Sequence, residues 1–166
     1  MPTNYERAFA ERPEVYAAWQ QLNAAIKANM DLRRYELVTL VAARRLHSTY
    51  CALAHGSILL EQFGEPVRDI ALDYRGAGLD EVDVAVMDLA VRVVDDASSI
   101  DDADLQPLRD LGLADADIAD VVLAAAARCF FSKTLDGLDA RADASYRALD
   151  PALLEVLVVG RPIAED

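Results

Sequence analysis

The chain has 166 residues, of which 54% are hydrophobic and only 7 are glycine and 6 proline, a composition that favours helices over strands. This length is about that of one domain with a substantial core. The formal net charge is -13, so most of the surface would repel DNA or an anionic membrane. We therefore expect an all-α protein of one domain, residues 1–166, that binds neither nucleic acid nor membranes.

The N-terminal segment MPTNYERAFAERPEVY is charged and lacks the apolar stretch of a secretion signal, and no apolar run is long enough to span a membrane. These features predict a cytoplasmic protein. Two cysteines, Cys51 and Cys129, are too few for a disulfide scaffold and are expected as thiols unless they turn over in redox chemistry. The acidic residues between Asp80 and Asp120 are read as a solvated face with helix N-caps.

Apolar residues at three- and four-residue steps, with capping residues at the ends, predict a series of helices. In chain order we expect helices at 13–29, at 32–46 after a cap at Asp31, from Ser48 or Thr49 to Gly64, at 67–74, from about 82 to 96, briefly around 101–111, and from Asp115 or Asp117 onward. The last helix is apolar on most sides over 118–135, so it should be central in the fold or pack against another subunit. The tail is expected as broken helix, or with LLEVLVV as a strand-like or exchanged segment.

Cys51 and His55 are the leading candidates for chemistry. A cysteine in the first turn of a helix lies beside unpaired N–H groups and the positive end of the helix dipole, both of which favour a thiolate. His55 follows one turn later and can take or return the thiol proton. The pair alone is a weak motif, because a cysteine is often simply a small buried residue.

The block from Glu36 to His55 strengthens that assignment. Glu36, eleven further residues, and then Ser48-Thr49-Tyr50-Cys51-Ala52-Leu53-Ala54-His55 resemble the signature of the alkylhydroperoxidase D-like branch of the carboxymuconolactone decarboxylase family. In that signature a Glu is followed by Cys-x-x-Cys and, after three more residues, by His. The resemblance implies the family's helical bundle over about residues 13–138, a thiol-dependent peroxidase activity against a small-molecule peroxide, and a homo-oligomer.

Ser48 stands where the family has its first cysteine, so this chain cannot form the local disulfide of the dithiol cycle. A serine hydroxyl could instead hydrogen-bond the Cys51 thiolate or cap the helix. The resemblance then implies a one-cysteine mechanism in which His55, aided by Glu36, deprotonates Cys51. The resulting sulfenic acid would be reduced by an external thiol or by Cys129, which can also be read as a core thiol.

Several roles stay open at this stage. Glu36 could act in a proton relay or form an ion pair with one of the arginines nearby in sequence: Arg33, Arg34, Arg44 and Arg45. Tyr50 is expected to line the pocket and to donate a hydrogen bond, and His47 is expected in an exposed loop. A metal held by Glu36, Cys51 and His55 is disfavoured because no second histidine has a ligand spacing, and no motif implies an organic cofactor.

Two other functions remain. A cofactor-free decarboxylase of small carboxylated lactones, the other activity of the family, would use His55 as proton donor and draw positive charge from Arg44 and Arg45. Alternatively, loss of the first cysteine is what a non-catalytic oligomeric family member would show.

Overall fold

A computed structural model describes residues 2–165, and every regular element in that range is helical. The helices are α1 (Asn4–Ala8), α2 (Pro13–Lys27), α3 (Leu32–Arg45), α4 (Thr49–Phe63), α5 (Val67–Asp73), α6 (Glu81–Asp96), α7 (Asp102–Asp110), α8 (Asp115–Gly137) and α9 (Pro151–Leu157), with short 3-10 turns at Ala97–Ser99 and Ala144–Ala148. The predicted all-α class is confirmed. The predicted helices from residue 13 to residue 137 are all present, most with ends within a few residues of those expected.

The capping residues explain several of these boundaries. Asp31 accepts a hydrogen bond from the backbone N–H of Arg34 at the start of α3, and Asp80 and Asp101 cap α6 and α7 in the same way. Gly64 ends α4 in the left-handed conformation that glycine adopts without steric cost. The acidic side chains between Asp80 and Asp120 therefore include helix caps, as the sequence predicts.

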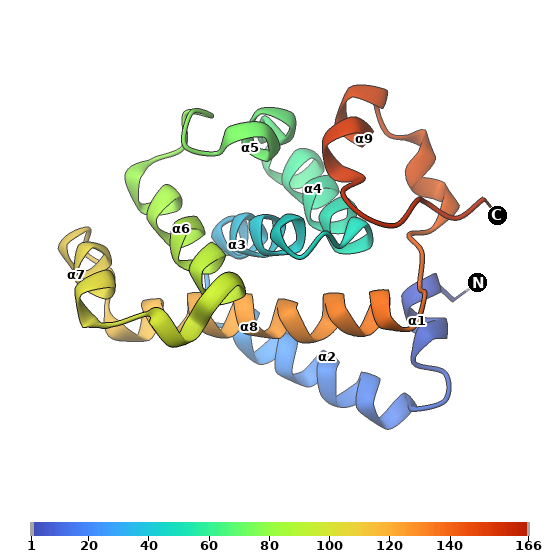
Figure 1. Ribbon diagram of the computed structural model, residues 1–166, viewed down its shortest axis with the longest axis horizontal. Helices are drawn as coiled ribbons and strands as arrows, with labels where there is room; N and C mark the ends of the chain where they lie inside the picture. Colours follow the sequence, from blue (N-terminus) through green and yellow to red (C-terminus); the bar gives the residue numbers. More distant parts are fainter. Residues whose placement is uncertain (1, 166) are drawn as a thin grey trace.

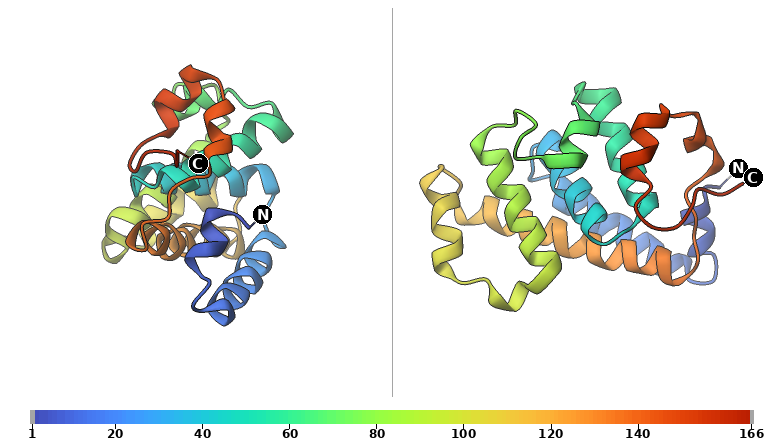
Figure 2. Two further views of the ribbon diagram at one scale, coloured as in Figure 1. Left: turned by 90° about the vertical axis from the view of Figure 1, so that its right-hand side faces the viewer. Right: turned by 45° about the horizontal axis from the view of Figure 1, so that its top comes forward.

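Helix α3 lies at the centre of the molecule and packs against α4, α6 and α8 (Figure 1). Helix α8 passes between α3 and α2, while α6 and α7 lie at one end of the molecule. Helix α1 and the segment that follows α9 both lie at the opposite end of the molecule (Figure 2). This arrangement brings α2, α4 and α8 around one cavity.

Helix α8 is central, which is the first of the two placements predicted from its apolar sequence. Ile118, Val121, Ala125 and Leu135 are buried in the main core, whereas Leu123 and Phe130 remain exposed. Self-association through this helix stays a prediction. None of the helices within residues 2–165 has the length and apolar character needed to cross a membrane.

The two ends of the chain are also helical. Helix α1 was not expected. The tail is broken helix, the first of its two predicted forms, and residues 153–157 of the LLEVLVV segment belong to α9 rather than to a strand-like or exchanged tail. Phe9, Leu153, Leu157 and Ile163 are buried in the same core as the central helices, so this core extends beyond residues 13–138. Helix α9 packs on α4 and α5 because its apolar side chains cover theirs.

The turn between α3 and α4 is held by the C-terminal segment. His47 ends the turn with a positive φ of 56°, and its backbone oxygen lies only 1.9 Å from where a Cβ on Gly160 would stand. The N–H of Gly160 donates to Thr49 Oγ1 at 2.9 Å. A glycine is therefore required at position 160, and its close approach fixes the start of the helix that carries Cys51.

Candidate active site

Cys51 and His55 line one cavity of about 410 Å³. They are the third and seventh residues of α4, one helical turn apart, and both are buried, with Cys51 only 3% exposed. The cavity is further lined by aromatic side chains and by a few polar groups from α2 and α8: Tyr5, Tyr16, Trp19, Gln20, Asn23, Lys27, Tyr50, Arg128, Phe131 and Tyr146. The predicted nucleophile and base thus share a site that is mostly aromatic.

Glu36 reaches this site from α3. Its Oε2 lies 2.5 Å from Nδ1 of His55, and its Oε1 lies 3.3 Å from Nζ of Lys27. An ionised carboxylate can only accept hydrogen bonds, so Nδ1 of His55 carries the proton and donates it to Glu36. Nε2 is then the unprotonated ring nitrogen, which is the tautomer that a base needs. The structure thus pairs Glu36 with His55, together with a lysine from α2.

The surroundings of this pair lower the pKa of both groups. Burial lowers the pKa of His55 to about 4, and the charge of Arg128 acts in the same direction against the effect of Glu36. Burial on its own would raise the pKa of Glu36, but the hydrogen bond from His55 and the charge of Lys27 outweigh it, so the pKa is lowered. At neutral pH the pair is therefore a neutral imidazole bound to a carboxylate.

Arg128 also lines this cavity, and it was not named as a candidate from the sequence. It projects from α8, is 4% exposed, and its Nη1 lies 3.5 Å from Sγ of Cys51 while Nη2 donates to the hydroxyl of Tyr35 at 3.3 Å. Its guanidinium also lies 5.7 Å from the centre of the Trp19 ring and 5.6 Å from that of Phe131. In the sequence, Arg128 could have been recognised as the single charged residue inside the apolar run VVLAAAARCFF.

Tyr50 lines the cavity, as expected, but its hydroxyl is already engaged. It donates to Asp143 and accepts from the N–H of Tyr5 at 3.3 Å, so it joins α1 to α4. Burial and the Asp143 carboxylate raise the pKa of Tyr50, which keeps the hydroxyl protonated. The predicted hydrogen bond from Tyr50 is therefore made within the protein.

Ser48 occupies the predicted N-cap position, but the predicted contacts of its hydroxyl are absent. The side chain is fully buried, caps no N–H of α4, and its Oγ makes no hydrogen bond within residues 2–165. Ser48 therefore does not hold the Cys51 sulfur.

Cys129 is half-buried on α8 and is not among the residues that line the Cys51 cavity. It follows Arg128 directly, and successive residues of a helix point in directions about 100° apart. Burial raises the pKa of the Cys129 thiol, which keeps it protonated. The structure therefore does not bring the second cysteine to the first.

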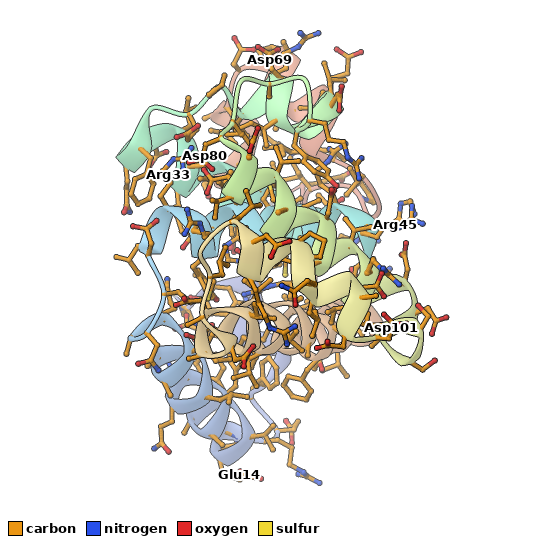
Figure 3. The ribbon with its side chains drawn as sticks, turned by 90° about the vertical axis from the view of Figure 1, so that its left-hand side faces the viewer. Glu14, Arg33, Arg45, Asp69, Asp80 and Asp101 are labelled. Atoms are coloured by element: carbon orange, nitrogen blue, oxygen red, sulfur yellow. The ribbon has the colours of Figure 1, made fainter. Side chains whose placement is uncertain are left out.

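None of the four arginines considered as partners of Glu36 contacts it. Arg33 and Arg34 bind the buried carboxylate of Asp83, Arg45 pairs with Asp95, and Arg44 donates to the backbone oxygen of Val156. Figure 3 shows Arg33 and Arg45 on opposite sides of α6, with Arg45 projecting outward. Arg44, Arg45 and the exposed His47 line a different cavity, of about 350 Å³. The positive charges at the Cys51 cavity are instead those of Lys27 and Arg128.

Solved structures resemble the fold of this protein over most of the chain. One is an uncharacterized peroxidase-related protein from Ralstonia eutropha JMP134, described as an alkylhydroperoxidase AhpD core, which is 20% identical with a TM-score of 0.81 and covers 96% of this chain and 83% of its own. The chain has the AhpD-like helical fold. A second match, an uncharacterized peroxidase-related protein from Silicibacter sp. TM1040, is 22% identical with a TM-score of 0.82 and covers 89% of this chain and 80% of its own.

No protein-family model and no curated protein matches the sequence. At 20 to 22% identity the solved structures establish the AhpD-like fold alone. The function has to be argued from the side chains around Cys51.

Proposed function

We propose that this protein is a thiol-dependent, peroxidase-like oxidoreductase that uses Cys51 as its single redox nucleophile. The observation that carries the proposal is the 3.5 Å contact between Sγ of Cys51 and Nη1 of Arg128, inside the cavity that His55 also lines. A fixed guanidinium stabilises the negative sulfur that a peroxide requires as its attacking group. The AhpD-like fold and the peroxidase-related names of its structural neighbours agree with this reading.

The first step is removal of the thiol proton. His55 is neutral, and its Nε2 is free because Nδ1–H is donated to Glu36. Nε2 accepts the proton of Cys51, which leaves an imidazolium beside the Glu36 carboxylate and a thiolate beside Arg128. Both new charges therefore form next to an existing charge of opposite sign, and Glu36 acts by orienting and stabilising His55.

The second step is attack on the peroxide. The thiolate binds the terminal oxygen of R–O–O–H, the S–O bond forms as the O–O bond breaks, and the products are a Cys51 sulfenic acid and an alkoxide. The alkoxide takes the proton from His55 and leaves as the alcohol. The sulfur loses two electrons to the peroxide, and His55 and Glu36 return to their starting state.

Trapping the sulfenic acid tests this proposal. The protein is treated with an organic hydroperoxide and then with a dimedone-type reagent, and labelled peptides are identified by mass spectrometry. We expect the label on Cys51 in the wild type and in Cys129→Ser, and none in Cys51→Ser. Label confined to Cys129, or no label on a folded protein, would contradict the proposal.

A second candidate is the cofactor-free decarboxylation of a carboxylated lactone, which Arg128 favours because it places positive charge in the cavity of His55. The positive charge that binds the substrate carboxylate would come from Arg128 and Lys27, since Arg44 and Arg45 lie at the other cavity. The variant Cys51→Ser separates the two: peroxide consumption is lost if Cys51 is the nucleophile, whereas a decarboxylase based on His55 would keep its activity.

A further inference from the structure

Arg128 is a buried cation without an anionic partner among residues 2–165. Its guanidinium contacts a thiol, a phenol and two aromatic faces, its Nε makes no hydrogen bond, and no carboxylate lies at ion-pair distance from it. The nearby carboxylate of Glu36 is already shared by His55 and Lys27. Since arginine stays charged in proteins, the cavity holds an uncompensated positive charge whenever the sulfur is neutral.

The catalytic cycle proposed above leaves the sulfur neutral once the peroxide has reacted. The Cys51 thiolate formed in the first step balances Arg128, but the protonated sulfenic acid that replaces it does not. Burying a cation without a partner is costly, so the oxidised site favours the arrival of an anion. The oxidised site should therefore bind an anionic reductant of the Cys51 sulfenic acid more tightly than a neutral or cationic one.

The position of Cys51 also limits the size of the reductant. Its side chain is 3% exposed and is reached through a cavity of about 410 Å³, which suits a small molecule. Cys129 does not line that cavity, and Ser48 has no thiol to offer. The reductant must therefore come from outside and be small enough to enter.

We propose that the reductant of oxidised Cys51 is a small thiol that carries a carboxylate, held beside Arg128 and Lys27. This inference rests on the proposed peroxidase function. The thiol attacks the sulfenic sulfur, an S–S bond forms, and the hydroxyl leaves as water with the thiol proton. A second thiol then attacks the mixed disulfide, which releases the Cys51 thiol and the symmetric disulfide of the reductant, so two thiols supply the two electrons.

Thiol–disulfide exchange tests the charge preference without any peroxide, because exchange with a symmetric disulfide forms the same mixed disulfide on Cys51. The probes are dithiodipropionate, hydroxyethyl disulfide and cystamine, whose halves carry negative, zero and positive charge. The protein is Cys129→Ser, so that one thiol reacts, and intact mass measures the extent of exchange at equilibrium. Each value is divided by that of the same protein in urea, which removes intrinsic differences between the probes.

We expect the folded protein to favour the anionic mixed disulfide over the neutral one by about tenfold, and to disfavour the cationic one, as a charge-assisted contact to a buried guanidinium implies. The net charge of -13 works in the opposite direction, so such a preference has to be local. Arg128→Met should abolish the preference and Arg128→Lys should retain much of it. If Arg128→Met does not fold, Lys27→Met should still reduce the preference, and Arg45→Met, at the other cavity, should not.

Equal exchange with all three probes, or no exchange with the anionic probe on a folded protein whose unfolded form reacts, would overturn the inference. These results are independent of the peroxide step. A protein that forms the sulfenic acid but shows no charge preference would keep the proposed function and lose this inference. A protein that prefers the anionic probe but never forms the sulfenic acid would lose the function and keep an anion-selective thiol site.

Discussion

Two cavities of this molecule are each lined by arginine and histidine side chains, but the partners of these side chains differ between the two. At the first cavity, Arg128 contacts a sulfur and two aromatic rings, and the ring of His55 is fixed by Glu36. At the second, Arg45 is neutralised by Asp95, and His47 is exposed with its Nδ1 3.2 Å from the backbone oxygen of Val159. The charge that each cavity presents therefore depends on burial and on the partner of each side chain rather than on residue type.

The comparison also explains why the arginines of α3 were the wrong candidates. Arg33, Arg34 and Arg45 lie close to Glu36 in sequence but have carboxylate partners on α6. A solvated or paired guanidinium has little charge left to offer a substrate. Arg128 is distant in sequence and has no such partner within the described residues, which leaves its charge directed at the Cys51 cavity.

The largest expected contrast is between the two cysteines. Cys51→Ser should lower the rate of peroxide consumption by at least about a thousandfold, because a hydroxyl cannot be oxidised to the sulfenic acid. Cys129→Ser should leave the rate within about twofold, since Cys129 does not line the cavity. A coupled or direct peroxide assay measures both. A comparable loss in Cys129→Ser would show that the second thiol takes part after all.

The two histidines should differ in how they couple stability to pH. His55 has a pKa of about 4 when folded and about 6.5 when unfolded, so the unfolded chain binds the extra proton between these values. The free energy of unfolding should therefore fall as the pH is lowered from about 6.5 to about 4, by roughly 3 kcal/mol at most, and be fully restored above that window. Glu36, whose pKa is lowered, adds to the loss only below about 4.5.

Urea unfolding across that pH range checks this prediction with a matched pair of variants. His55→Asn should flatten the dependence between about 6.5 and 4.5, whereas His47→Asn should keep it, because His47 is exposed and asparagine tolerates its positive φ. The chain has only these 2 histidines, so no third one can account for the slope. An unchanged slope in His55→Asn would mean that the buried histidine is not its source.

The two classes of arginine should differ in their effect on the Cys51 thiol. Arg128→Met should slow alkylation of Cys51 by iodoacetamide at neutral pH by about tenfold, because the counter-charge of the thiolate is lost. Stability should be unchanged or raised, since an apolar residue replaces an unpaired buried charge. Arg45→Met should leave the alkylation rate unchanged. A faster reaction in Arg128→Met would indicate that the guanidinium shields the sulfur instead of activating it.

The smallest contrast concerns the two hydroxyls at the start of α4. The Oγ of Ser48 is buried without a hydrogen bond, so Ser48→Ala should leave the free energy of unfolding within about 0.5 kcal/mol or raise it. Thr49 Oγ1 accepts a hydrogen bond from the N–H of Gly160, so Thr49→Val should lower the free energy of unfolding by about 1 to 2 kcal/mol. Urea titrations at neutral pH resolve the difference. A larger loss in Ser48→Ala than in Thr49→Val would give Ser48 a structural role that its surroundings do not suggest.

The sequence by itself determined the helices and the chemical core of the site. The spacing of apolar residues, the cap at Asp31 and the stop at Gly64 are local signals, and they predicted the helices from α2 to α8. The one-turn spacing of Cys51 and His55 is also local, because residues four apart share a helix face. The resemblance in the block from Glu36 to His55 anticipated the AhpD-like fold.

Only the tertiary structure decided which charges meet. The pairing of Glu36 with His55 and Lys27, and the placement of Arg128 against Cys51, each depend on how separate helices pack. Arg128 lies 77 positions from Cys51 in the chain, so no local spacing could connect them. The positions of Ser48 and Cys129 were likewise set by packing, which left the Ser48 hydroxyl without a hydrogen bond to the sulfur and kept the second thiol out of the cavity.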